Sequence, residues 1–159
     1  MLEVNVIFKG VIMRIQAIKT ELDTDPLGLA YSELDDTAVA VSLNEKTRSK
    51  LEPISSAELL AWSANNARLQ KIKTAAESGA DDTIKSVAQA AYLMITRDDT
   101  TLDLNLADRV ALLDALVSYS VLTAEDKTSL ESLATVAISR GEEIGVGLVR
   151  AGDVIQARL

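Results

Sequence analysis

The sequence predicts an all-α protein: a compact antiparallel bundle of five to seven helices with an irregular, glycine-containing C-terminal tail. Apolar residues recur at helical spacing along most of the chain, and helix-capping residues stand between the apolar segments. The hydrophobic fraction is 48% but only 3% is aromatic, which suits close helix packing by small side chains. The 159 residues fit one domain, and we expect residues 13–159 to form it.

Composition excludes several classes of function. The net charge is −8, and the 16 basic residues are scattered among 24 acidic ones, so binding to nucleic-acid backbones or anionic membranes is disfavoured. The chain has no Cys and no His, which excludes disulfides, thiolate nucleophiles, Cys/His zinc sites and imidazole acid–base chemistry. No apolar run has the length of a membrane span. We therefore expect no catalytic residue, no cofactor, no metal and no enzymatic activity.

Residues 1–12 allow two interpretations. Apolar residues alternate with others from Leu2 to Phe8, which is compatible with a short strand. Alternatively, codons for Lys9-Gly10-Val11 can contain a purine-rich ribosome-binding sequence just before Met13. We favour this second interpretation, in which residues 1–12 are a translated leader or a flexible N-terminal segment.

A helix is expected from Met13, with Ile15, Ile18 and Leu22 on one face, and it should end at Asp25 because proline follows. Asp35 or Asp36 can cap a second helix that runs to about Leu43.

Ser55 and Glu58 form a capping-box pattern, which predicts a third helix that breaks near Asn65-Asn66 and stops at Gly79. Asp81 or Asp82 caps the next helix, with Arg97 in its last turn.

Asn105 is expected to cap a largely buried central helix with two apolar stripes, one of which begins at Leu106. Thr123 and Asp126 predict a last long helix that ends at Gly145. In the tail from 146 to 159, Asp153 should cap a final short turn.

Three pairs of carboxylates stand out as a pattern that could support chemistry, and helix capping explains them better. Asp35/Asp36, Asp81/Asp82 and Asp98/Asp99 each lie at a predicted helix boundary, where Asp accepts backbone hydrogen bonds. No serine has a histidine partner, and no phosphate-binding loop is present.

Both ends of the chain carry a set of motifs that the middle lacks. The set comprises Leu22, Asp25-Pro26-Leu27-Gly28, Tyr31, Ala40, Leu43-Asn44, Arg48, Ser139-Arg140, Glu143, Ile144-Gly145-Val146-Gly147, Val149, Gly152, Val154 and Ala157-Arg158. In these motifs the chain resembles a group of small uncharacterised proteins of tailed bacteriophages, whose genes often lie among virion structural genes. The resemblance implies a virion-associated or assembly role and supplies no catalytic residue.

The leading hypothesis is a non-enzymatic phage structural or assembly protein that contacts other phage proteins or itself. It would act in the cytoplasm of the host bacterium during assembly, and in the virion. The candidate contact residues lie outside the long predicted helices: Pro26, Leu27, Gly28, Tyr31, Val149, Val154 and Arg158. The alternative is a phage-encoded binder that inhibits a host defence protein or sequesters a signalling nucleotide.

Overall fold

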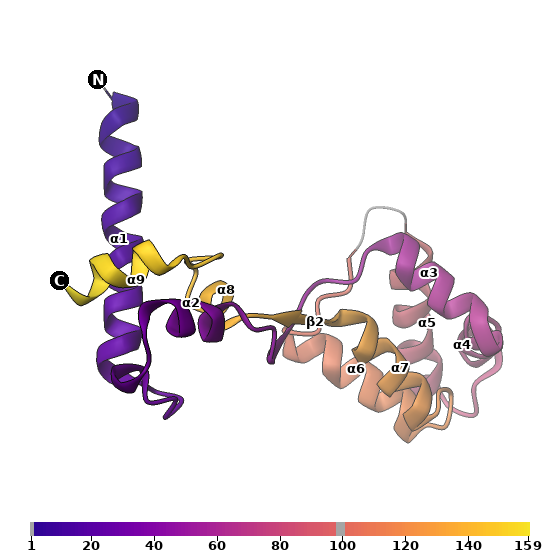
Figure 1. Cartoon of the computed structure of the whole chain (residues 1–159). Coiled ribbons are helices and arrows are strands. Elements are labelled where there is room, and N and C mark those ends of the chain that lie inside the picture. The colour runs from indigo at the N-terminus through magenta and orange to yellow at the C-terminus, as the bar shows by residue number, and fades with distance from the viewer. Residues whose placement is uncertain (1, 98–100) are drawn as a thin grey trace. The chain divides into compact units, whose positions relative to one another are not determined.

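The structure is a computed structural model that describes residues 2–97 and 101–159, with side chains from residue 9 onward. The chain is mostly helical, which confirms the all-α class, and a small two-stranded sheet accompanies the helices. Contacts divide it into two compact units (Figure 1): unit 1 joins residues 1–49 to 137–159, and unit 2 comprises residues 50–136. We expected one bundle over residues 13–159, so the division is a difference from the sequence prediction.

Unit 1 is built by the two ends of the chain. It contains α1 (Leu2–Thr24), the 3₁₀ turn η1 (Tyr31–Glu33), α2 (Asp36–Asn44), α8 (Arg140–Glu143) and α9 (Ala151–Arg158). Helix α9 packs against both α1 and α2 (Figure 1). The core contains Ile18 from α1, Val39 and Leu43 from α2, and Val154 from α9, all fully buried.

Unit 2 is a separate helical core. It contains α3 (Ser56–Ala64), the 3₁₀ turn η2 (Asn65–Ala67), α4 (Arg68–Ser78), α5 (Asp82–Thr96), α6 (Ala107–Ser118) and α7 (Ala124–Ala134). Helices α4 and α5 pack along each other, and α3 and α6 also contact α5. Leu59, Ile72, Leu116 and Leu130 are among the fully buried residues that the helices contribute to this core.

The core of unit 2 contains one buried ion pair among the described residues. Nε of Arg68 lies 2.6 Å from Oδ1 of Asp126, and both side chains are nearly inaccessible. The Arg68 guanidinium also lies 4.8 Å from the ring centroid of Trp62, and its Nη1 donates to the Trp62 carbonyl. Arg68 of α4 thus binds Asp126 of α7 and contacts Trp62 of α3.

The chain passes from unit 1 to unit 2 in β1 (Arg48–Leu51) and returns in β2 (Thr135–Ile138). These strands form the two-stranded sheet, and just beyond it the amide of Glu52 donates to the carbonyl of Ala134 at 2.8 Å. Unit 2 is therefore a continuous segment whose two ends lie side by side.

Local capping chemistry confirms most predicted helix starts. Asp35 and Asp81 accept hydrogen bonds from amides three residues on, and Ser55 and Thr123 form capping boxes. The predicted break at Asn65-Asn66 is also present, since Asn66 has a left-handed backbone. The Asp98/Asp99 pair lies outside the described residues.

Several local predictions are wrong. Residues 2–12 are helical, being the start of α1, so the strand interpretation fails; a translation start at Met13 stays a prediction. The helix predicted from Thr123 to Gly145 ends at Ala134, because the β-branched Thr135, Val136 and Ile138 enter β2.

The tail and the central helix also differ from expectation. The tail is more regular than expected, because Ala151–Arg158 forms α9, in which Asp153 accepts from the Arg150 amide. Helix α6 begins after Leu106, which is exposed and outside the core. Among the described residues, no helix has the length and apolarity needed to cross a bilayer.

Candidate functional site

The loop that follows α1 has a fixed backbone and an apolar surface. The Asp25 carboxylate accepts hydrogen bonds from the amides of Leu29 at 2.9 Å and Ala30 at 2.8 Å. The amide of Gly28 donates to the Asp25 carbonyl, and Gly28 has a φ of 63°, which glycine adopts without strain. Within this frame the side chains of Leu27 and Leu29 are 37% and 42% exposed.

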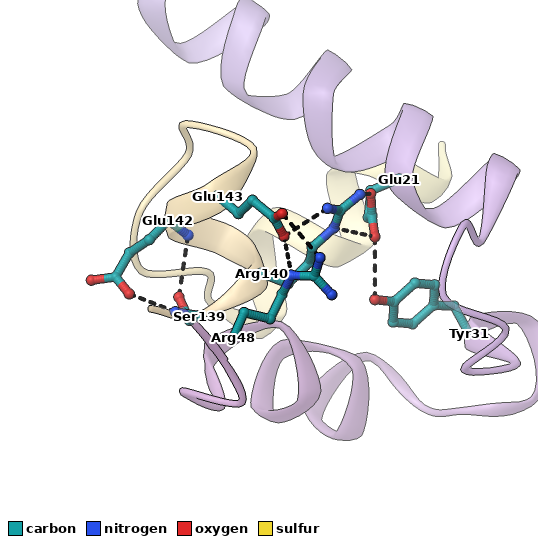
Figure 2. A network of polar contacts seen from close by, with 7 residues as sticks. All are labelled: Glu21, Tyr31, Arg48, Ser139, Arg140, Glu142 and Glu143. Atoms are coloured by element: carbon teal, nitrogen blue, oxygen red, sulfur yellow. Dashed lines mark hydrogen bonds and ion pairs between the residues drawn. The ribbon is translucent and has the colours of Figure 1, made fainter. Parts of the chain in front are cut away.

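Tyr31 anchors the end of this loop in the core of unit 1 (Figure 2). Its side chain is 1% exposed, and its hydroxyl lies 3.5 Å from Oε1 of Glu21 on α1. Burial, together with the negative charge of Glu21, raises the pKa of Tyr31 to about 12. The phenol therefore stays neutral and can donate to Glu21 throughout the physiological range.

Glu21 is itself buried, at 4% exposure, and is neutralised by an arginine from the other end of the chain. Nε and Nη2 of Arg140 donate to its two carboxylate oxygens at 2.8 and 2.7 Å. This two-pronged geometry is the strong form of an arginine–carboxylate pair, and it satisfies a charge that would be costly to bury alone. The pair holds α8 against α1.

Arg140 continues the network toward the surface (Figure 2). Its Nη1 donates to Oε2 of Glu143 at 2.8 Å, and Arg48 donates to the same carboxylate through Nη2 at 3.1 Å and forms an ion pair with it. The hydrogen bond from Arg140, followed by that from Arg48, holds the pKa of Glu143 below its usual value. Glu143 is therefore a carboxylate at neutral pH, held between two arginines.

The residues around Arg140 explain how the backbone of α8 is positioned so that Arg140 reaches Glu21. Ser139 and Glu142 form a capping box: the Ser139 hydroxyl accepts from the Glu142 amide at 3.2 Å, and the Glu142 carboxylate accepts from the Ser139 amide at 2.7 Å. At Gly141 a Cβ atom would lie 2.4 Å from the Gly147 carbonyl oxygen and 3.3 Å from that of Leu43. Glycine thus permits the close backbone approach that brings α8 into place.

The C-terminal helix holds the loop from its other side. Nη2 of Arg158 donates to the carbonyls of Tyr31 at 2.7 Å and Leu34 at 2.9 Å, and its Nη1 pairs with Asp36 at 2.8 Å. Residues 25–36 are therefore held by the loop's own Asp25 carboxylate, by Glu21 of α1 and by the Arg158 guanidinium of α9.

The predicted contact residues fall into three groups. Pro26, Leu27 and Gly28 lie on the surface, where a partner can reach them. Tyr31, Val149 and Val154 are buried in the core of unit 1, so within unit 1 their side chains are not accessible to a partner. Arg158 is largely engaged by Tyr31, Leu34 and Asp36, so it positions the loop. Arg140 and Glu143 belong to the motif set of the sequence, but the sequence did not indicate their interactions, and Glu21 was not singled out.

The charged side chains around the loop of residues 25–36 are engaged with one another and leave an exposed apolar surface at Leu27 and Leu29. Glu21 and Glu143 each face an arginine, and no group of three or more potential metal ligands occurs within residues 2–97 and 101–159. In unit 2 a groove of about 590 Å³ lies along α4 and the turn between α6 and α7. Lys71 is its single cation and Tyr119 its single aromatic side chain, which is sparse for a nucleotide site.

Compared with known proteins, the chain matches no protein-family model, no curated protein and no solved structure.

Proposed function

We propose that this chain is a non-enzymatic bacteriophage protein that takes part in virion structure or assembly through protein–protein contacts. Its partners would be other phage proteins or further copies of itself, in the host cytoplasm during assembly and in the particle. The resemblance at the two ends of the chain supplies the phage context. The supporting observation from the structure is the loop of residues 26–29, which we name the contact loop.

The contact loop has the properties of a preformed binding element. It exposes Leu27 and Leu29, while Asp25, Tyr31 and Arg158 fix the backbone on both sides. A loop that is already ordered loses little conformational entropy when a partner binds, so a small apolar contact can contribute net affinity. The buried network behind it explains why a surface loop can be rigid without being part of a helix.

Two experiments test this proposal. Mass spectrometry of purified virions and assembly intermediates should detect the protein at a stoichiometric level, and its absence from both would refute the assignment. The second experiment compares Leu29→Asp in the contact loop with Leu93→Asp on α5, because both leucines are exposed. Leu29→Asp should reduce incorporation or particle yield at least tenfold, and Leu93→Asp should leave both unchanged; equal effects would refute a role for the loop.

A further inference from the structure

The start of α1 presents an apolar surface that unit 1 does not cover. In Figure 1 the N-terminal half of α1 extends past α9, with no other described element of unit 1 beside it. Val11, Ile12 and Met13 are 50%, 61% and 65% exposed, respectively, although they are consecutive residues of one helix. Leu148 is also exposed and lies close by, since its carbonyl accepts a hydrogen bond from Arg14, the residue that follows Met13 in α1.

Through Val11 this surface continues the face by which α1 packs into its own unit. Val11, Ile15, Ile18 and Leu22 follow one another at spacings of four, three and four residues, and the last three pack in the core of unit 1. Spacings of four and three are those by which two helices bury a common seam. In sequence, the first turns of α1 add Leu2, Val4, Val6, Ile7 and Phe8 to the same apolar helix. Among the described residues of unit 1, no helix covers this line of apolar residues at Val11, which is 50% exposed.

We propose that a second copy of this chain supplies a covering helix, through pairing of the N-terminal halves of two α1 helices. A self-complementary seam suits a twofold dimer, in which the same patch serves both copies. Charge favours this segment over the rest of the molecule: residues 2–13 carry only Glu3 and Lys9, which cancel, whereas the whole chain has a net charge of −8. The rest of the chain therefore carries the whole net charge of −8.

The area buried between the two helices determines how strongly the two copies are expected to associate. Two paired helices of this length bury on the order of 1,000 Å², the lower limit for specific interfaces, so association should be weak and concentration-dependent. This inference rests on the proposed function and names one partner for it, a second copy of the chain. The contact between copies is made by α1, whereas the proposed function depends on the contact loop. The two can therefore fail separately.

Sedimentation velocity of the full chain from about 5 to 300 µM tests the inference. We expect a reversible monomer–dimer equilibrium that Val11→Lys weakens at least tenfold. Val41→Lys on α2 is the matched control, because Val41 is likewise an exposed helical valine of unit 1 and the charge change is identical. A chain that begins at Met13 should remain monomeric, while circular dichroism verifies that each variant is folded.

Three results would overturn the inference: a monomeric full chain at every concentration, equal weakening by the two lysine variants, or undiminished dimerisation of the chain that begins at Met13. Failure of this experiment, with Leu29→Asp still impairing particle assembly, would remove the second copy as a partner and leave the contact loop in place. The opposite pattern would remove the contact loop alone.

Discussion

Replacing Arg140 by methionine should strongly destabilise unit 1, because it leaves the buried Glu21 carboxylate without its cation. Glu21 is 4% exposed and would lose both of its hydrogen bonds from Arg140. Breaking a buried ion pair costs about 3–5 kcal/mol. The Arg140 side chain is 17% exposed, so some water can reach the site, and we expect about 3 kcal/mol. Urea denaturation followed by circular dichroism measures this loss.

Two further variants separate burial from simple loss of charge. Arg48→Met removes the other cation beside Glu143, but that ion pair is about one-third exposed on both sides, so the cost should be at most about 1 kcal/mol. Combining Arg140→Met with Glu21→Gln removes the unpaired charge and should recover part of the lost stability. If Arg140→Met costs no more than Arg48→Met, or the double variant is the less stable one, the reasoning from burial is wrong.

Three other predictions concern stability and pH. Gly141→Ala should destabilise the protein by about 1–3 kcal/mol in urea denaturation, because the new Cβ meets a backbone oxygen, whereas Gly152→Ala, with nothing within 4 Å, should be neutral or stabilising. Tyr31 should ionise near pH 12 in an absorbance titration. Its raised pKa makes stability fall as pH rises from about 10 to about 12, a component that Tyr31→Phe should abolish. Burial alone raises the pKa of Asp126, but hydrogen bonds led by Arg68 outweigh it and hold that pKa below 3.8. Asp126→Asn should therefore cost about 2 kcal/mol at pH 7, and the difference should vanish as pH falls well below 3.8.

Helix starts could be predicted from the sequence because a cap is a local interaction. Ser55 and Glu58 are three residues apart and satisfy each other's backbone groups whatever the rest of the chain does. The strand from 135 to 138 had a usable signal in its β-branched residues, which the apolar stripe of the preceding helix obscured.

The network behind the contact loop could not be predicted in the same way. Glu21 and Arg140 are 119 positions apart, and nothing in either local sequence names the other as its partner. One signal was present: Glu21 stands between Ile18 and Leu22 on the apolar side of α1, where a charged residue requires a partner. That observation identifies a buried carboxylate but does not identify its cation. The division into two units was missed for the same reason, because unit 1 depends on contacts between the two ends of the chain.

The motifs that carry the phage resemblance all lie in unit 1. The first and last residues of unit 2 lie close together, since the amide of Glu52 donates a hydrogen bond to the carbonyl of Ala134. A segment with adjacent ends has the topology of an insertion, which a fold tolerates when its removal leaves the flanking contacts intact. We therefore expect unit 1 to fold when residues 53–133 are replaced by a short Asn-Gly turn. Circular dichroism should show a helical protein with cooperative unfolding, and hydrogen exchange should show that the amides of Leu29 and Ala30 remain protected. An unfolded product would mean that unit 1 depends on unit 2 for stability.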